Sequence, residues 1–251
     1  MEYREYGAGQ KNAVILLHGG GLSWWNYRKE ADLLSGRFRV ILPVLDGHAG
    51  SGQPFTSIED CAARIISFID QRLDGQAFLI GGLSLGGQVL LEMLSQRGDI
   101  CRHALAESAM AVPSKLTAAL IRPSLDCSFG LIRSRRFARL QFRSLHMPPD
   151  LFEDYYRDTC AISRQDMAAF LSASMSYRLK ESFGACRAQV HVFAGEKETR
   201  GILRSARLIH EKAPGSELTV LPGRYHGGFS LRQPEAYVRQ IESLAQRFFG
   251  E

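Results

Sequence analysis

The serine of Gly82-Leu83-Ser84-Leu85-Gly86 has the surroundings of a catalytic nucleophile. This G-x-S-x-G sequence directly follows the apolar run 77–80 and opens a helical stretch at about 87–97. A sharp strand-to-helix turn needs backbone angles that side chains obstruct, which accounts for the small flanking residues. Such a turn would lift the Ser84 hydroxyl out of the sheet. A passive serine in a glycine-rich turn is the alternative, and the partner residues elsewhere in the chain argue against it.

A nucleophilic serine needs a base, and the base needs an acid that orients it. His226 lies in the loop after the last apolar run of the chain, and Glu196 and Glu198 lie just after the preceding run. The order along the chain is therefore nucleophile, acid, histidine. The other six histidines are interpreted as structural or surface residues: His18, His48, His103, His146, His191 and His210.

The glycines of His18-Gly19-Gly20-Gly21 offer backbone N–H groups that a ligand could approach closely. We expect the N–H of Gly20, in preference to that of Gly21, to bind a developing oxyanion together with the N–H of Leu85. A phosphate-binding loop is not expected, because the pattern G-x-x-x-x-G-K-[ST] is absent. Gly21 and Trp24 are candidate wall residues of the substrate pocket.

Strand and helix signals alternate along the chain. Short apolar runs, typical of strands buried on both faces, are found at 13–17, 39–45, 77–80, 103–106, 189–194 and 217–221. Helical stretches are found at about 24–36, 57–73, 87–97, 200–213 and 234–249. This alternation predicts an α/β fold with a mostly parallel sheet of about six strands and helices on both faces. The glycine loop, the serine turn, the acids and His226 all follow strands, so they should meet at one edge of the sheet.

One long segment interrupts the alternation. Between 113 and 185 no buried-strand run is found, and amphipathic helical pieces are expected at 128–145, 150–159 and 164–174. We interpret 113–185 as a helical insertion between the fourth and fifth of these strands. The predicted organisation is therefore a core formed by 1–112 and 186–251, with one inserted helical unit.

The composition is that of an ordinary globular protein, because 45% of the 251 residues are apolar and 23% are charged. This balance excludes intrinsic disorder. The first residues, 1–6, are charged and lack the apolar core of a secretory signal, and the longest uncharged run, 75–91, is too short and polar for a membrane span. The five cysteines have no metal-ligand spacing and are odd in number, which favours a reduced, cytoplasmic protein without a metal site.

The positive charge is concentrated in one segment. Between Pro113 and His146, seven basic residues accompany the single acid Asp126, so the segment has a charge of +6. Because the whole chain has a net charge of +5, the remainder is close to neutral. The seven are Lys115, Arg122, Arg133, Arg135, Arg136, Arg139 and Arg143. A nucleic-acid binder with a uniformly basic surface has a different distribution, so no nucleic-acid partner is expected.

Together these motifs resemble the α/β-hydrolase superfamily over the whole chain from Tyr3 to Phe249. The segment Leu45-Asp46-Gly47-His48-Ala49-Gly50-Ser51-Gly52 also resembles the Asp-x-x-Gly-His-Gly-x-Ser loop of the lid-bearing branch. The resemblance implies that 113–185 is a helical cap over the active site, and it implies neither a metal nor an organic cofactor. Members often begin with two antiparallel strands, whereas only Tyr3–Tyr6 is left here, so the sheet should be shorter at that edge.

The resemblance also ranks the acids. The family has an aspartate at the fourth position of Gly-x-x-Asp, and Glu198 occupies that position here. A glutamate is longer by one methylene but can still orient a histidine. Glu198 is therefore the predicted acid, with Glu196 second and Glu107, near the end of the fourth predicted strand, third.

The predicted function is hydrolysis of a carboxylic ester by a Ser84–His226–Glu198 triad, through an acyl-enzyme. A serine nucleophile argues against the dehalogenase and epoxide hydrolase branches, which need an aspartate there. The same triad would serve a C–C bond hydrolase, a thioesterase or a cofactorless lyase, and a ligand receptor that kept the fold is the non-enzyme alternative. The partner is a small-molecule substrate in each case, and the oligomeric state is left open.

Two hypotheses account for the basic segment. The first is a cap helix with one apolar face and one solvated arginine face. The second is a cap that attracts an anionic substrate or an acidic surface through a screened attraction, which salt weakens.

Overall fold

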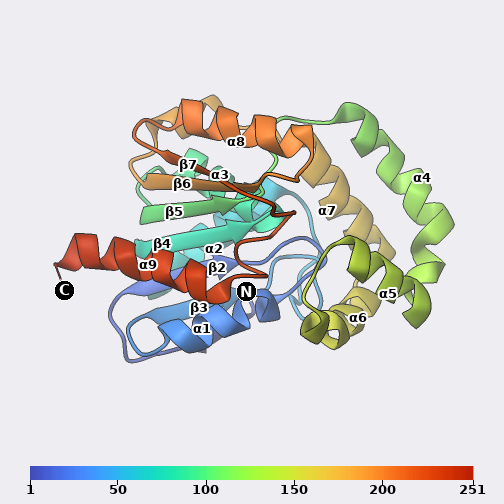
Figure 1. The fold of residues 1–251 in the computed structure, drawn as a ribbon, viewed down its shortest axis with the longest axis horizontal. Helices are drawn as coiled ribbons and strands as arrows, with labels where there is room; N and C mark the ends of the chain where they lie inside the picture. The colour runs from blue at the N-terminus through green and yellow to red at the C-terminus, as the bar shows by residue number, and fades with distance from the viewer. Residues whose placement is uncertain (251) are drawn as a thin grey trace.

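The computed structural model describes residues 1–250, which form a seven-stranded sheet in the order β1-β3-β2-β4-β5-β6-β7 (Figure 1). The strands are β1 (Tyr3–Tyr6), β2 (Ala13–Leu17), β3 (Arg39–Pro43), β4 (Ala77–Leu83), β5 (Cys101–Glu107), β6 (Gln189–Gly195) and β7 (Glu217–Leu221). The six strands from β2 to β7 are parallel, as the strand–helix alternation predicts. The short β1 adds a seventh strand, antiparallel to β3 at the edge of the sheet.

Alternate side chains of the central strands enter two separate apolar cores. In β2, Ile15 and Leu17 belong to one core and Val14 and Leu16 to the other, because successive strand residues point to opposite faces. Helices α2 (Ile58–Arg72), α3 (Leu85–Gln96) and α8 (Arg200–Lys212) contribute to the first core. Helices α1 (Arg28–Leu34) and α9 (Pro234–Phe249) cover the second, after the short 3-10 turn at Trp24–Tyr27. The sheet is therefore buried on both faces.

The helical segment between β5 and β6 lies to one side of the sheet (Figure 1). It contains α4 (Lys115–Ile132), α5 (Arg135–Ser144), α6 (Phe152–Ala161) and α7 (Arg164–Ser176), with short 3-10 turns at Pro149–Leu151 and Glu181–Ala185. The prediction of one helix over 128–145 was wrong, because the chain breaks at Arg133–Ser134 and α4 begins much earlier. Within residues 1–250, no helix is long and apolar enough to cross a membrane.

Candidate active site

The turn between β4 and α3 holds Ser84 in an unusual backbone conformation. Its φ is 54° and its ψ is −112°, values that a side chain with a Cβ atom rarely adopts. The flanking glycines allow a close approach of other backbone segments. A Cβ on Gly82 would lie 2.4 Å from the Gly86 carbonyl oxygen, and one on Gly86 would lie 2.1 Å from that of Leu17. The glycines of the motif are thus required by packing, and they place the half-buried Ser84 at the start of a helix.

His226 and Glu198 form a hydrogen-bonded pair at the neighbouring strand ends. The distance between His226 Nδ1 and Glu198 Oε2 is 2.8 Å. The Glu198 side chain is fully buried, and its other oxygen accepts hydrogen bonds from the Ser108 hydroxyl at 2.7 Å and the Gly195 N–H at 2.9 Å. A carboxylate in this position fixes the tautomer that keeps the proton on Nδ1 and leaves Nε2 able to accept one.

The hydrogen bonds keep Glu198 ionised in spite of its burial. Burial alone raises the pKa of the Glu198 carboxyl, but the hydrogen bond and charge of His226, with the hydrogen bonds from Gly195 and Ser108, outweigh it. The net pKa of Glu198 therefore lies below its ordinary value. An ionised partner stabilises the imidazolium that forms when His226 takes a proton.

The other two acids considered for this role have different partners. Glu196 Oε2 accepts a hydrogen bond from the Gly223 N–H at 2.8 Å. Glu107 is buried, and burial raises the pKa of its carboxyl above the ordinary value. Among residues 1–250, Glu198 is the acid whose carboxylate is hydrogen-bonded to His226.

The dipeptide Glu107-Ser108 at the end of β5 contacts the surroundings of both Ser84 and Glu198. The Ser84 N–H donates to the Glu107 carbonyl oxygen at 2.8 Å. The Ser108 hydroxyl donates to Glu198 and accepts from the Gly227 N–H at 3.3 Å. Ser108 also has a positive φ of 55°, a conformation that costs free energy for a residue other than glycine. Sequence reasoning missed this residue, although a serine directly after a buried strand was a visible signal.

The Glu107 side chain holds the loop that follows His226. Its carboxylate accepts from the Phe229 N–H at 2.8 Å and from the Ser230 N–H at 3.1 Å. These bonds are buried, so the position of the histidine loop is set by β5 as well as by β7. Glu107 therefore acts on His226 through the backbone, whereas Glu198 contacts its ring directly.

Two backbone N–H groups remain without a partner beside Ser84. The N–H groups of Gly19 and Gly21 donate to Asn26 and His48, respectively, at 3.2 and 3.0 Å. In the described chain no acceptor bonds the N–H of Gly20 or that of Leu85, the first residue of α3. An N–H at the start of a helix has no intrahelical acceptor and favours negative charge. These are the two donors predicted for the oxyanion.

His18 and His48 fix the glycine loop from below. His18 Nδ1 donates to the Gly19 carbonyl oxygen at 2.9 Å, and its Nε2 accepts from the Leu45 N–H at 3.0 Å. His48 Nε2 accepts from Gly21, and its Nδ1 donates to the Asp46 carbonyl oxygen at 3.0 Å. Burial lowers the pKa of His48 to about 4, so its ring is neutral at pH 7 and can accept. Both histidines have structural roles here.

A cavity of about 320 Å³ contains the side chains of Ser84 and His226. Its walls are mostly apolar: Gly19, Gly20, Leu22, Leu83, Met110, Leu145, Met147, Leu171, Ser174, Met175, Ile202 and Leu231 complete the lining. Gly21 and Trp24 do not line it, contrary to the pocket roles predicted for them. Trp24 instead packs against the guanidinium groups of Arg4 and Arg28, 5.4 and 5.2 Å from its ring centre.

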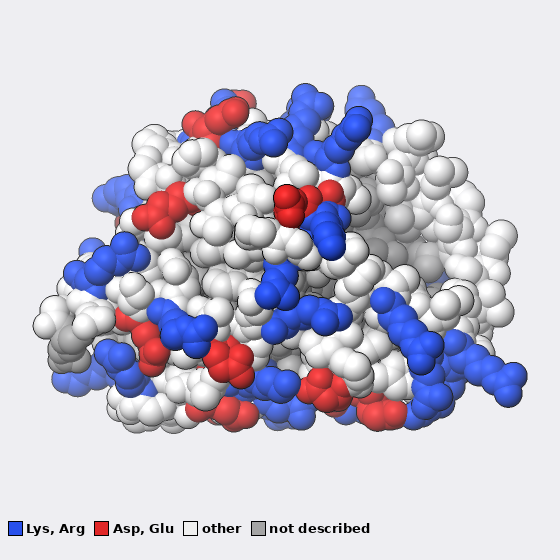
Figure 2. Space-filling view, viewed as in Figure 1, with Lys and Arg blue, Asp and Glu red and all other residues white. Residues whose placement is uncertain are grey.

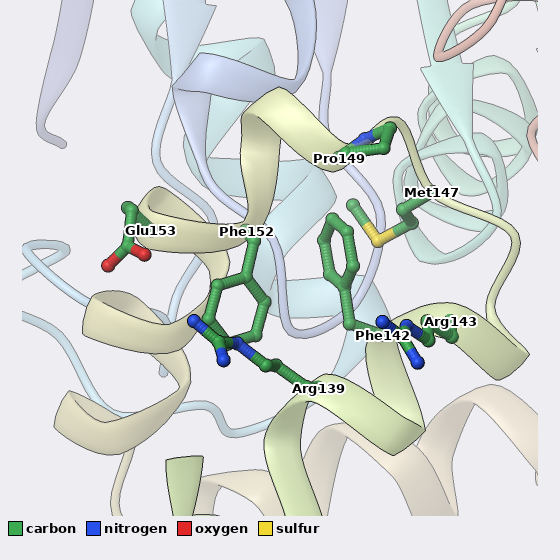
Figure 3. Close-up of a pocket in the computed structure, with 7 residues that line it drawn as sticks. All are labelled: Arg139, Phe142, Arg143, Met147, Pro149, Phe152 and Glu153. Atoms are coloured by element: carbon green, nitrogen blue, oxygen red, sulfur yellow. The ribbon is translucent and has the colours of Figure 1, made fainter. Parts of the chain in front are cut away.

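A second cavity of about 350 Å³ lies between α5 and α6 (Figure 3). Phe142 and Phe152 form much of its wall, and Arg139 and Arg143 lie at its side (Figure 3). Met147 lines both cavities. The basic side chains of the inserted helices thus face this second cavity, and none of them lines the cavity of Ser84.

The family model described as "Alpha/beta hydrolase family" matches residues 14–240. The chain belongs to this family. Solved structures agree in fold: a thermophilic esterase from Thermogutta terrifontis has a TM-score of 0.80 and 19% identity, with 98% of this chain and 93% of that chain covered. MenH from S. aureus has a TM-score of 0.77 and 16% identity, with 98% of both chains covered.

An enol-lactonase from Burkholderia xenovorans has a TM-score of 0.74 and 14% identity, with 98% of this chain and 96% of that chain covered. No match to the sequence is found among curated proteins. The family and these neighbours show that this alpha/beta hydrolase is an enzyme of the hydrolase type.

Proposed function

We propose that the protein is a serine hydrolase that cleaves carboxylic esters through an acyl-enzyme on Ser84. The observation that supports this most directly is the meeting of three elements in one place. The His226–Glu198 pair has a hydrogen bond of 2.8 Å, Ser84 and His226 line the same cavity, and two unpartnered N–H groups flank the serine. The esterases among the structural neighbours favour the same bond type.

The reaction has two half-reactions. Ser84 Oγ attacks the ester carbonyl carbon as its proton passes to His226 Nε2, and the N–H groups of Gly20 and Leu85 bind the oxyanion. The intermediate collapses when His226 returns this proton to the leaving alcohol. Water then attacks the acyl-enzyme, again losing a proton to His226, and the carboxylic acid is released with Ser84 restored. Glu198 stays ionised throughout and stabilises the charged ring.

The inserted helices act as a cap in this proposal, with 1–112 and 186–251 as the core. Five residues of the segment 113–185 line the catalytic cavity: Leu145, Met147, Leu171, Ser174 and Met175. They form the wall opposite the strand ends. The cap therefore excludes water from the acyl-enzyme and shapes the bound group, which is the role that a covering segment has in many hydrolases.

The lining indicates an uncharged, apolar group next to the cleaved bond. No Lys, Arg, Asp or Glu lines this cavity. Burying an unpaired carboxylate or ammonium there would cost several kcal/mol. A cavity of about 320 Å³ is small among ligand sites, which favours a short acyl or alcohol group.

The decisive experiment compares wild type with Ser84→Ala on 4-nitrophenyl esters of increasing acyl length, and on labelling by a fluorophosphonate. We expect Ser84→Ala to lower turnover by at least about 10³-fold and to abolish labelling, with an unchanged melting temperature. Ser174→Ala is the matched control, because this serine lines the same cavity without a nearby base, and it should keep both activities. Undiminished labelling of Ser84→Ala would contradict the proposal.

A further inference from the structure

The outward face of α4 is apolar and exposed to solvent. Leu116, Leu120 and Leu131 are 76%, 54% and 50% exposed. The residues that lie three, four, seven, eleven, fourteen and fifteen positions after Leu116 share its side of the helix. These are Ala119, Leu120, Pro123, Cys127, Gly130 and Leu131, all exposed and all uncharged. Figure 2 shows this area as an uninterrupted white surface over α4.

The inward face of the same helix is apolar as well. Leu125 and Ile132 are buried, and Ile121 and Phe129 pack partly buried against the core. A helix that is apolar on both faces is normally covered on both. The contact of α4 with α7 covers the inner face only. Apolar residues scattered singly on a surface need no explanation, but a contiguous helix face of this kind marks a contact site.

The charge around this face is strongly positive. Helix α5 packs against α4, and its arginines are visible as the blue area beside the white one in Figure 2. Within residues 1–250, Arg135 forms an ion pair with Glu153, while six basic residues of the segment have no acidic partner within 4.0 Å. These are Lys115, Arg122, Arg133, Arg136, Arg139 and Arg143. The surface therefore combines exposed leucines with unpaired cations.

We propose that α4 and α5 bind the surface of a lipid bilayer that contains anionic lipids. The α4 leucines would enter the boundary between headgroups and acyl chains, and the unpaired arginines would contact lipid phosphates. An amphipathic helix with basic neighbours lies in the plane of the interface, so no membrane-spanning segment is needed. The inference does not depend on the proposed catalytic function.

A second copy of this chain fits the same surface less well. In a symmetric dimer the same patch is used by both subunits, so α4 would meet α4 and the arginines of α5 would lie near their own copies. No acidic residue of α5 is available to offset this repulsion. The charge thus favours an anionic partner over self-association, and lipid phosphates supply that charge together with an apolar layer.

The test is co-sedimentation of the full chain with vesicles of phosphatidylcholine alone and of phosphatidylcholine mixed with phosphatidylglycerol. We expect binding to the mixed vesicles, weakening as salt is added, and little binding to phosphatidylcholine alone. The double variant Leu116→Ser/Leu120→Ser should bind at least about tenfold more weakly. Leu33→Ser is the matched control, because Leu33 is 53% exposed on α1, far along the chain from this surface, and it should bind like wild type.

A second pair of variants separates charge from apolar contact. Arg136→Gln/Arg143→Gln should weaken binding to the mixed vesicles by about fivefold per arginine while retaining a normal melting temperature. Absence of binding by wild type, or equal loss in Leu33→Ser, would overturn the proposal. So would a wild-type dimer in light scattering that Leu116→Ser/Leu120→Ser converts to a monomer, because the face would then be a contact between copies.

Discussion

The edge of the sheet that holds Ser84 and the basic segment of the inserted helices contain charged groups in opposite situations. At the sheet edge, the carboxylates of Glu198 and Glu107 are buried and accept several hydrogen bonds each. In the segment 113–146, the cations are exposed and most have no acidic partner among residues 1–250.

This difference separates positioning from recognition. A buried charge is stable only when its hydrogen bonds are satisfied, so each one fixes the backbone that supplies the donors. An exposed cation has water as its partner and imposes no geometry on the fold. The sheet edge can therefore hold reacting groups in place, whereas the basic segment is free to meet an external partner.

The largest effect is expected from Glu198→Gln. The variant keeps the shape of the side chain but removes the charge that orients His226, so kcat should fall by about 10³- to 10⁴-fold on 4-nitrophenyl esters. Glu196→Gln, which removes an acid hydrogen-bonded to Gly223 only, should stay within about twofold of wild type. Equal losses in both variants would show that the sheet edge acts as a general electrostatic field rather than as a fixed pair.

Ser108→Ala should have a smaller effect through the position and charge of Glu198. Loss of the hydroxyl removes one of the hydrogen bonds that lower the pKa of Glu198, and kcat should fall about tenfold with little change in KM. The stability that Glu198 contributes is complete above its unfolded pKa of about 4.3 and is lost as the pH falls through the depressed folded-state pKa. In Ser108→Ala this loss should begin at a higher pH in denaturation experiments.

Ser95→Ala is the control for that variant, because the Ser95 hydroxyl bonds only the Leu91 carbonyl oxygen of its own helix. Its kcat and its stability between pH 7 and pH 3 should match those of wild type. A tenfold loss of kcat in Ser108→Ala without any shift in the pH at which stability is lost would indicate that Ser108 supports the loop alone.

Glu30→Gln tests the cost of a buried carboxyl that lacks such bonds. Burial raises the pKa of Glu30 well above the ordinary value, so the folded protein holds this proton at a pH where the unfolded chain has lost it. The free energy of unfolding of wild type should therefore fall as the pH rises above about 4.3. Glu30→Gln should lack this fall, and the exposed Glu235→Gln should retain it. Parallel curves for wild type and Glu30→Gln would contradict the assignment.

The smallest effect is expected from Arg136→Gln in the basic segment. Arg136 is exposed and has no acidic partner among the described residues, so the free energy of unfolding should change by less than about 0.5 kcal/mol. Turnover of an uncharged ester should be unchanged, because no basic residue lines the catalytic cavity. A large loss of stability would remove the distinction between the two regions.

Much of the fold was predictable because its signals are local. The six apolar runs became the strands β2 to β7, and their alternation with helices fixed the parallel arrangement. The errors fall where local signals compete. The helical pattern over 128–145 is continuous in the sequence, yet the chain breaks at Arg133–Ser134, and the four residues of β1 pair only because the edge of β3 is available.

The candidate site divides in the same way. The glycines around Ser84 and the loop of Gly20 are recognisable because backbone approaches of this kind leave no room for a side chain. The contacts of Ser108 and Glu107 with the loop of His226 join residues more than a hundred positions apart, and nothing local in the sequence signals such contacts. The predicted wall residue Trp24 failed for the same reason, because the cavity wall is formed by the inserted helices.

The sequence by itself determined the fold class, the nucleophile turn and the concentration of positive charge, because each depends on neighbouring residues and their spacing. Only the tertiary structure decided which acid meets His226, which side chains enclose Ser84, and which face of α4 is left uncovered. These depend on how distant elements pack. A carboxylate has a depressed pKa, or a leucine an exposed side chain, only once the rest of the chain has taken its place around it.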